Sequence, residues 1–553
     1  MIPTPLAADV AAFRRPPEQV MRLARLGSAH PTRLSFLRVL LRRMQAEHWT
    51  FDRPVWQIDS KGVGRAVYRA KGPDRTYSLV AFAHDLPDEM RSDRVIATAW
   101  DATFALFDGT PTTADLDRLQ ANVPLQEAGR ITRSELALSR ANRSVRLFAH
   151  VVDRLASGQQ PDRAEIEAVG YLMRTTAVYG SGKFGAADRA AIAERPELRA
   201  PFQAEMLSVW LTRSFTVDLV EHLAAVKGGG RAARLDHDLR RSLGVGNSTG
   251  LGMAPFLIRH PTLLNNWMMV REEALARIRA QPEAQPQACA DFARALQDAI
   301  LNAQSWVSDH PVQVAKLSHL RADLARIAAQ GVPSGAYPWN ALWLWAEAHL
   351  SLEGQEALVS LMLEPHGALV DGLSDCMDAD EAKAFALDGS ETVAAFRAGL
   401  AERYGWALVT DYDAPQNTAR FWYVSEEKLE PRLGERWQED GAALELPIGI
   451  GRMAYALHLA LVDWPGDQPL ARFLMAHPEH RLMARRVQQS ARYPYMEIQD
   501  NLLAADMMPI DILRCKLACF GASHFDPRSD RWLRISLFQG QPYPDELAQT
   551  ATE

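Results

Sequence analysis

Cysteine is scarce in this chain: the 553 residues include only Cys289, Cys376, Cys515 and Cys519. Four cysteines are too few for a disulfide framework in a chain of this length, and they indicate a reducing compartment. The first residues lack a basic stretch followed by an apolar one, so no secretory signal is predicted. No apolar run approaches the roughly 18 residues of a membrane-spanning helix. We therefore expect a cytoplasmic protein without a membrane partner.

An excess of positive charge is also missing, because 61 Lys and Arg stand against 68 Asp and Glu, for a formal net charge of −7. Proteins that grip a phosphate backbone carry a basic excess, so nucleic acid is not the expected partner. Hydrophobic residues at 47% and charged residues at 23% are typical of soluble globular proteins. A chain this long exceeds what one hydrophobic core usually serves, which predicts two or three domains.

Short segments rich in Val, Tyr, Phe and Thr predict two small β regions, near residues 55–108 and 405–425. The expected strands are Val63–Lys71, Thr76–Asp85 and Arg94–Phe107 in the first region, Trp406–Thr410 and Arg420–Val424 in the second, and Trp532–Phe538 near the end. The composition of Gly72-Pro-Asp-Arg75 is typical of a turn. An antiparallel meander is the simplest arrangement of the first region.

Helical spacing of apolar residues dominates the middle of the chain. The expected helices include Ile131–Leu155, Arg163–Val178, Phe202–Val226, Thr262–Ile278 and Cys289–Trp306. We therefore predict an α+β protein that is predominantly α-helical, with a central helical bundle and small antiparallel β regions. The predicted domains are an N-terminal α+β region at 1–112, a central helical domain with glycine-rich loops at 113–400, and a C-terminal α+β region at 401–553.

The first glycine-rich segment is Tyr179-Gly-Ser-Gly-Lys-Phe-Gly185. Ser181, Lys183 and the exposed N–H groups of its glycines could bind a carboxylate or phosphate, with Tyr179 as a further donor. The alternative is that Gly180 ends the preceding helix. An ATPase P-loop is excluded by Ala177 and Phe184, which replace its first glycine and its hydroxyl residue, and by the helix expected before it.

The second glycine-rich segment is Gly244-Val-Gly-Asn-Ser-Thr-Gly-Leu-Gly-Met253. Four glycines enclose Asn247, Ser248 and Thr249, a pattern that predicts a backbone able to approach a ligand closely. The spacing is not that of a dinucleotide-binding loop, and no βαβ unit is expected around it.

Arg259 and His260 follow this second segment. A guanidinium there could pair with a substrate carboxylate through two hydrogen bonds, and the imidazole could transfer protons near neutral pH. The alternative is that both are solvated surface charges or helix caps.

The order Ser-Thr-Gly-Leu-Gly-Met-Ala-Pro, followed by Arg-His-Pro, resembles the Ser-Ser-x-Met-Pro-x-Lys-x-Asn-Pro loop of the fumarase and adenylosuccinate lyase superfamily. Members of that superfamily are largely helical. This chain departs from the motif, since Ala254 separates Met253 from Pro255, Arg259 replaces the lysine, and His260 replaces the asparagine. The resemblance implies only that a lyase belongs among the candidate functions.

Three other groups of residues suggest alternatives. Asp236-His-Asp238 could offer metal ligands, but one helix cannot place all three on one face, so a surface charge cluster is expected. Cys515 and Cys519 share a helical face ahead of His524, which allows a thiol-dependent hydrolase or transferase. The close tryptophans Trp339, Trp343 and Trp345 favour packing or an interface, as in a non-catalytic helical scaffold that binds a protein partner.

The function predicted from these residues is an enzyme, a lyase or hydrolase, that acts on a small carboxylate- or phosphate-bearing metabolite by acid–base chemistry. The residues expected to bind the substrate are Ser181, Asn247, Ser248, Thr249 and Arg259. The residues expected to transfer protons are His260, Tyr179 and Lys183. No motif requires a cofactor or a metal ion, and a homo-oligomer is allowed for.

Overall fold

The computed structural model describes residues 10–21, 23–87, 99–123, 132–180, 192, 194–250, 261–307, 311–377, 386–413, 447–492, 514, 517–522, 524–529 and 532–549. The chain forms two compact units. The helical unit comprises Met1–Leu34, Thr249–Cys519 and Pro527–Leu533, and the sheet unit comprises Ser35–Ser248, Phe520–Asp526 and Arg534–Glu553.

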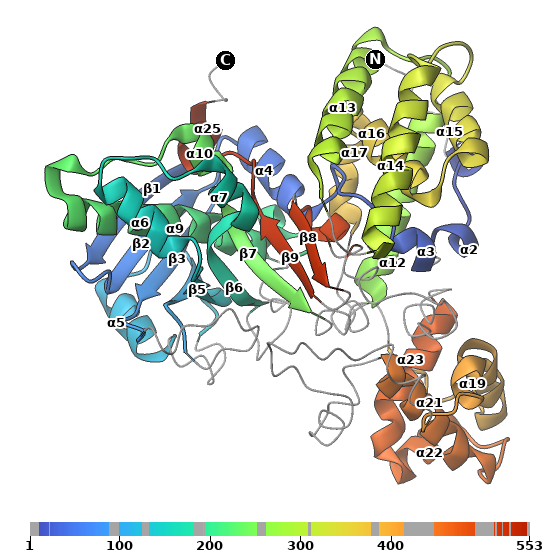
Figure 1. Ribbon diagram of the computed structural model, residues 1–553. Coiled ribbons are helices and arrows are strands. Elements are labelled where there is room, and N and C mark those ends of the chain that lie inside the picture. The colour runs from blue at the N-terminus through green and yellow to red at the C-terminus, as the bar shows by residue number, and fades with distance from the viewer. Residues whose placement is uncertain are drawn as a thin grey trace. The chain divides into compact units, whose positions relative to one another are not determined.

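A single sheet organises the sheet unit (Figure 1). Its strands are β1 (Thr50–Ile58), β2 (Gly64–Lys71), β3 (Thr76–Ala83), β4 (Ala102–Asp108), β5 (Glu135–Arg143), β6 (Tyr171–Gly180), β7 (Gly244–Gly250), β8 (His524–Ser529) and β9 (Trp532–Leu537). The spatial order is β1-β2-β3-β4-β5-β6-β7-β9-β8. Strands β1 to β6 pair antiparallel in sequence order, whereas β7 pairs parallel with β6. The antiparallel meander predicted for the first β region is confirmed.

Helices cover both faces of this sheet. They are α4 (Phe36–Ala46), α5 (Thr113–Asn122), α6 (Phe148–Ala156), α7 (Arg163–Val169), α9 (Gln203–Gly228), α10 (His237–Arg241) and α25 (Pro544–Gln549). On β4, the Phe104 ring packs against Phe215 of α9, while the next residue, Ala105, belongs to the core formed with Leu116 and Leu119 of α5. Adjacent strand residues therefore face different helices, as the two-residue period of a strand requires.

Two segments predicted to be helices form strands over part of their length. Strand β5 lies within the predicted helix Ile131–Leu155, and β6 begins within the predicted helix Arg163–Val178 and ends at Gly180. Each contains a short run of consecutive buried apolar residues, Leu136–Leu138 in β5 and Tyr171–Met173 in β6, and such runs do not distinguish a strand from a buried helix. The predicted central helical bundle is therefore not confirmed. The prediction that helices predominate is confirmed.

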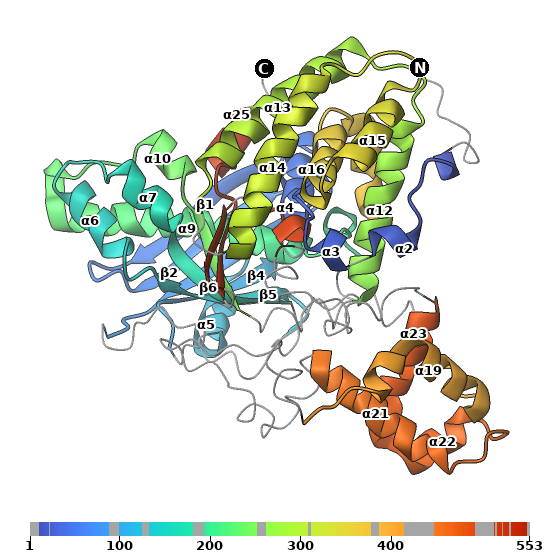
Figure 2. The same ribbon diagram turned by 45° about the vertical axis from the view of Figure 1, so that its right-hand side comes forward.

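The helical unit begins with α2 (Pro17–Val20) and α3 (Leu23–Leu26), which contact the later helices of the same unit (Figure 2). Those helices are α12 (Pro261–Arg279), α13 (Pro286–Ser305), α14 (Pro311–Gln330), α15 (Pro338–His349), α16 (Leu352–Leu363) and α17 (Gly367–Val370), followed by the 3-10 helix η5 (Asp371–Cys376). The predicted helices Thr262–Ile278 and Cys289–Trp306 are confirmed as α12 and α13.

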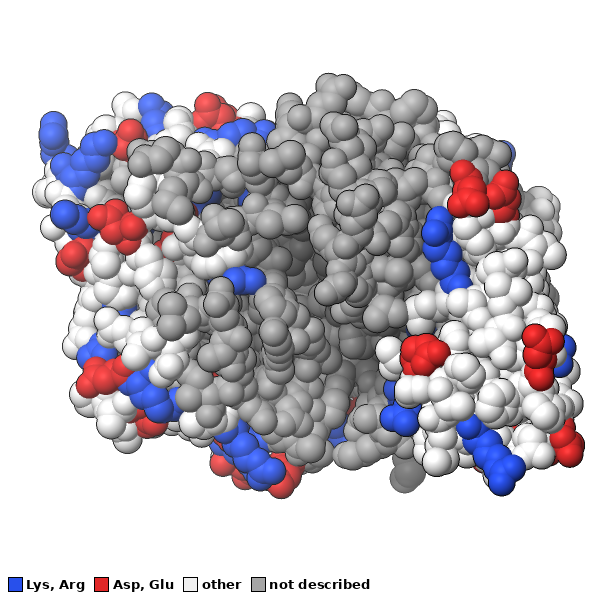
Figure 3. All heavy atoms as spheres, turned by 90° about the horizontal axis from the view of Figure 1, so that it is seen from below, with Lys and Arg blue, Asp and Glu red and all other residues white. Residues whose placement is uncertain are grey.

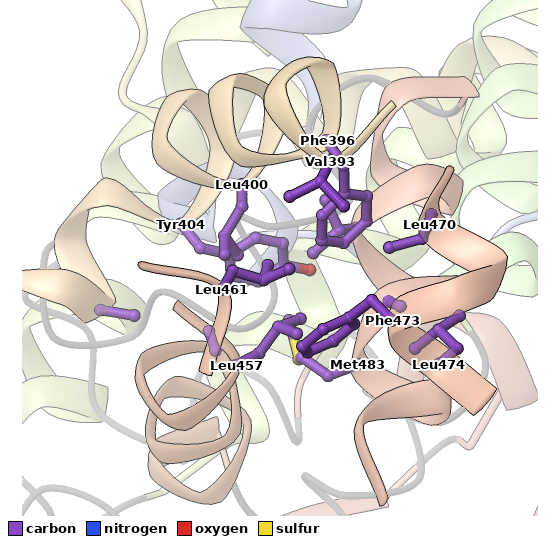
Figure 4. Packing of buried hydrophobic residues seen from close by; sticks show 14 of the residues in the cluster. Val393, Phe396, Leu400, Tyr404, Leu457, Leu461, Leu470, Phe473, Leu474 and Met483 are labelled. Carbon is purple, nitrogen blue, oxygen red and sulfur yellow. The ribbon is translucent and has the colours of Figure 1, made fainter. Parts of the chain in front are cut away.

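A separate core joins four helices that follow in this unit (Figure 4). These are α19 (Val393–Leu408), α21 (Pro447–Val462), α22 (Leu470–Ala476) and α23 (Arg481–Arg492), with η8 (Pro478–His480) between the last two. Each of the four helices contributes buried side chains to this core, for example Phe396 of α19, Leu457 of α21, Phe473 of α22 and Met483 of α23. The predicted strand at Trp406–Thr410 is wrong, because α19 continues to Leu408; Arg420–Val424 lies outside the described residues.

No helix in the described part of the chain is both long enough and apolar enough to cross a bilayer. Figure 3 shows one face of the molecule, on which acidic and basic side chains of the described residues are interspersed.

Candidate functional site

The predicted site residues lie at the ends of two strands or beyond them. Tyr179 belongs to β6, and Asn247, Ser248 and Thr249 belong to β7. Ser181, Lys183, Arg259 and His260 lie outside the described residues. The backbone positions of Tyr179, Asn247, Ser248 and Thr249 can therefore be described. For the other four residues, only the order along the chain is known: each follows β6 or β7 in sequence.

The two glycine-rich segments belong to neighbouring parallel strands. The paired residues are Tyr171 with Gly244, Arg174 with Gly246, and Thr175 with Asn247. The Thr175 hydroxyl also donates a hydrogen bond to the Gly246 carbonyl oxygen, at 3.2 Å. Because parallel strands run in the same direction, β6 and β7 carry both segments to the same edge of the sheet. The sequence alone left open whether the two segments come together; the pairing places the start of the second segment beside Tyr171–Thr175 of β6, four residues before the first segment begins.

The local structure before the first segment differs from the prediction. Gly180 ends strand β6, and it does not follow a helix. The helix expected before residue 179 was wrong from Tyr171 on, where β6 begins, whereas its first part is helix α7. The exclusion of a P-loop now depends on Ala177 and Phe184 alone.

Packing inside the sheet explains two of the four glycines in the second segment. A Cβ atom at Gly246 would lie 2.5 Å from the ring of Tyr171, and a Cβ atom at Gly244 would lie 2.4 Å from the carbonyl oxygen of Leu537. Real Cβ contacts are longer than this, so both positions require glycine for close strand packing. The argument for a ligand-approaching backbone therefore applies only to the later glycines, Gly250 and Gly252.

Strand register aligns the end of β6 with residues of β5 whose faces are known. Tyr179 pairs with Leu138, and Leu138 belongs to the core on the α5 side. Val178 pairs with Ser139, whose hydroxyl oxygen lies 3.5 Å from that of Ser208 on α9. Opposite residues of an antiparallel pair share a face. Leu138 and Ser139 therefore lie on opposite faces of the sheet, with the polar Ser208 of α9 on the Ser139 side.

Buried polar side chains line the α9 side of β5 and β6. Ser208 of α9 lies beside Ser139 of β5. Ser139 pairs with Val178, which is two residues before the end of β6. Glu205 lies one helical turn before Ser208 on α9. Glu205 is 2% exposed, and Arg174 of β6 is 3% exposed. A buried carboxylate, a buried guanidinium and buried hydroxyls thus belong to the unit that contains β5 and β6. This supplies groups able to transfer protons and to pair with an anion.

Sequence reasoning missed Glu205 because α9 was interpreted as an amphipathic helix with one apolar face. The structure buries nearly all of its first four turns. Polar residues at Gln203, Glu205, Ser208 and Thr212 of an otherwise apolar segment were the available signal, since a helix that is buried all round keeps a polar residue only where it has a partner or a role.

A second concentration of buried charge lies in the helical unit. We call it the Arg15 cluster; it consists of Arg15, Arg25, Arg271, Glu272 and Glu356. Arg15 Nε donates to Glu272 Oε2 at 2.6 Å, and Arg25 Nη1 donates to Glu356 Oε1 at 2.6 Å. Arg271 is paired with Glu356 as well. Burial by itself would raise the pKa of Glu356, but Arg271, Arg15 and Arg25 together lower it well below its usual range.

One helical turn away on α16, Glu353 forms a related group. Arg514 donates two hydrogen bonds of 2.8 Å to its carboxylate, and Lys316 and His30 lie 3.6 and 3.7 Å from it. Burial opposes ionisation of Glu353, yet the charges of Arg514, His30 and Lys316 lower its pKa well below the usual range. Such clusters arise in active sites and in structural ion-pair networks alike, so perturbed pKa values do not by themselves assign a function.

The remaining groups singled out in the sequence have structural roles among the described residues. Asp236 caps α10 by accepting a hydrogen bond from the N–H of Asp238, at 3.0 Å. Trp339 and Trp343 are fully buried. Cys519 is buried as a free thiol, Cys515 lies outside the described residues, and His524 begins β8. In the described ranges, no group of three or more His, Cys, Asp or Glu could hold a metal ion.

No family model matches this chain, and neither the curated proteins nor the solved structures searched contain a match. The functional argument therefore depends on the residues themselves.

Proposed function

We propose that this chain is an enzyme that binds a small carboxylate- or phosphate-bearing metabolite beside the carboxyl ends of β6 and β7. The observation that carries this proposal is the parallel pairing of the two strands, with Thr175 opposite Asn247. It supports a common location for two segments rich in donors that are separate in sequence. In sheets with parallel strands, ligands commonly bind outside the carboxyl ends where the strand order changes.

The strand order changes at this point. Up to β6 each strand pairs antiparallel with its predecessor in sequence; β7 is parallel, and its other neighbour is β9. The connection from β6 to β7 contains α9, as in a βαβ crossover. Glycine N–H groups and the Asn247, Ser248 and Thr249 side chains, together with Ser181 and Lys183, would bind the anion. Arg259 would orient the substrate.

The proposed reaction is acid–base elimination or hydrolysis, with His260, Tyr179 and Lys183 as the groups that transfer protons. The lyase option keeps its support from the short resemblance around Met253 and Pro255. The two alternatives lack a comparable observation, because Cys519 is buried and the tryptophans Trp339 and Trp343 are enclosed in the protein core.

The test is ligand-induced thermal stabilisation with inorganic phosphate and a panel of small dicarboxylates and phosphate esters. A ligand that binds only the native protein raises its melting temperature by mass action. We expect a stabilising compound for the wild type, and a loss of that stabilisation in both Lys183→Ala and Ser248→Ala. Lys61→Ala is the matched control, because Lys61 is exposed in the β1–β2 turn.

Two results would overturn the proposal. One is the absence of any stabilising compound in the panel. The other is a stabilisation that survives in Lys183→Ala and Ser248→Ala as fully as in Lys61→Ala. A loss in only one of the two variants would contradict the shared location of the segments. The segment that carries that variant would then be the binding site.

A further inference from the structure

The Arg15 cluster does not balance its charge. Arg15, Arg25 and Arg271 carry three positive charges, and Glu272 and Glu356 carry two negative ones. Each of the five side chains is no more than 7% exposed. Taking an uncompensated charge out of water is unfavourable, so a buried network normally pairs its charges or binds a counter-ion. Within the five described side chains of the cluster, one positive charge remains without an anionic counterpart.

A fourth guanidinium adds to this excess. Arg279 donates hydrogen bonds to the side-chain oxygen of Asn340 and to the carbonyl oxygen of Phe13, at 3.0 and 2.7 Å. Both acceptors are neutral. Burial lowers the pKa of Arg279 to about 10, and the nearby charge of Arg15 acts in the same direction against that of Glu347. The Trp343 ring lies under both cations, 4.7 Å from the Arg15 carbon and 5.6 Å from the Arg279 carbon.

Two buried donors of the Arg15 cluster, and one of the Trp343 ring that lies under Arg15, have no hydrogen-bond acceptor among the described residues. They are Nε and Nη1 of Arg271 and Nε1 of Trp343, and both side chains are fully buried. Arg271 Nη1 lies 3.6 Å from Glu272, which is an ion pair but too long for a hydrogen bond. Glu356 Oε2 also forms an ion pair with Arg271. This contact is close but lacks hydrogen-bond geometry. Buried donors in native proteins are almost always satisfied, by protein, water or a bound ion.

We propose that the Arg15 cluster binds a small monovalent anion of the halide class. Such an ion supplies the missing negative charge and accepts hydrogen bonds from several donors. A multiply charged oxyanion fits less well, because it would place further negative charge beside Glu272 and Glu356. A larger organic anion fits less well too, because Arg271 and Trp343 are enclosed in close-packed helices.

The bound ion has a structural consequence for the helical unit. Arg15 and Arg25 belong to the N-terminal segment, Arg271 and Glu272 to α12, and Glu356 to α16. The ion therefore ties the N-terminal segment to two helices that follow far later in the sequence. This site is distinct from the one proposed beside β6 and β7, and neither depends on the other.

The first test is thermal unfolding at constant ionic strength, with sodium gluconate replaced stepwise by sodium chloride or bromide. We expect the melting temperature to rise by about 3 °C and to reach a plateau, as specific binding to the native state requires. In Arg271→Met, which keeps the length of the side chain, this dependence should vanish. Arg277→Met is the control, because Arg277 lies on the same helix but is partly exposed and paired with Glu273.

Equal melting temperatures in gluconate and chloride would overturn the proposal, and so would a halide effect that persists unchanged in Arg271→Met. If Arg271→Met does not fold, crystals of the wild type grown in bromide decide the question. Anomalous scattering from bromide within the cluster is the expected result. Water at that place, in crystals containing bromide, would show that solvent satisfies the donors and would refute the anion site.

Discussion

The guanidinium carbon of Arg213 lies 3.7 Å from the centre of the Tyr543 ring. Arg213 also donates to the carbonyl oxygens of Leu243, Gln541 and Arg241, at 2.7, 2.8 and 3.2 Å. One buried side chain of α9 therefore holds the residue before β7 and the segment after β9. Helix α9, which packs against strands β1 and β4, is therefore also hydrogen-bonded to the segments that flank β7 and β9.

Arg213→Ala should destabilise the sheet unit strongly. The change removes a donor from each of three carbonyl oxygens, of which Arg241 keeps the Gly540 N–H, and removes the cation from the Tyr543 ring, so we expect a loss of about 3 kcal/mol in the free energy of unfolding. Urea unfolding followed by fluorescence measures this loss. Arg231→Ala, at an exposed position, should change it by no more than about 0.5 kcal/mol. Equal midpoints for the two variants would contradict the anchoring role of Arg213.

Parts of this fold could be predicted because their sequence pattern has one interpretation. The strands β2 and β3 are joined by a turn whose Gly72 N–H donates to the Arg75 carbonyl oxygen, as the turn composition indicated. Strand β5 could not be distinguished from a helix, because Leu136, Ala137 and Leu138 are all buried. A strand with helices on both faces loses the alternation that identifies it.

Gly246→Ala should destabilise the protein through a local clash. The new methyl group would lie 2.5 Å from the Tyr171 ring, which is buried and rigid, so strand or ring must move. We expect a loss of about 2 kcal/mol in the free energy of unfolding. Gly230→Ala is the control, because an added Cβ there meets no atom within 4 Å. Thermal unfolding of both variants measures the difference.

A double-mutant cycle identifies the cause. Combined with Tyr171→Val, the Gly246→Ala change should cost clearly less than it costs alone, because the smaller side chain makes room for the methyl group. A cost that is the same in both backgrounds would mean that the glycine is needed for another reason, such as ligand approach.

The same pair shows why the candidate site was only partly predictable. The sequence drew attention to two glycine-rich segments. It could not indicate that Gly246 accommodates Tyr171, because the contact depends on strand pairing between residues far apart in the chain. The burial of Glu205 was hidden in the same way, since it depends on how α9 packs in the folded chain.

The ion pairs of Glu356 should make stability fall in acid. Its pKa is lowered in the folded state from the ordinary value of 4.5, so the unfolded chain takes up the proton at a higher pH than the folded one. The stabilisation is complete above that ordinary value and is lost as the pH falls below it. Glu356→Gln should flatten this part of the profile and cost about 3 kcal/mol at pH 7, because three guanidiniums lose a charged partner.

The profile is measured as the free energy of urea unfolding between pH 3.5 and 7. Glu402→Gln is the control: Glu402 is 74% exposed, so its neutralisation should leave both the slope and the stability at pH 7 near those of the wild type. A Glu356→Gln profile parallel to that of the wild type would contradict the lowered pKa.

The cysteines should differ sharply in reactivity, which bears on the alternative of a thiol-dependent enzyme. Cys376 is exposed in η5, whereas Cys289 and Cys519 are buried. Burial also raises the pKa of the Cys289 thiol, which lowers the fraction present as the reactive thiolate. In a Cys515→Ser background, we expect the native protein to show one fast thiol with an aromatic disulfide reagent. The slow thiols should react only as the protein unfolds.

Replacing Cys376 by serine in that background separates the possibilities. The fast phase should disappear completely, because the two buried thiols are shielded by packed side chains. A fast phase that remains would come from Cys289 or Cys519, and adding Cys519→Ser identifies which. Fast modification of Cys519 would mean that this thiol is accessible in the native state despite its burial among Leu517 and Phe520. That result would favour thiol chemistry with His524 over the proposed acid–base reaction beside β6 and β7.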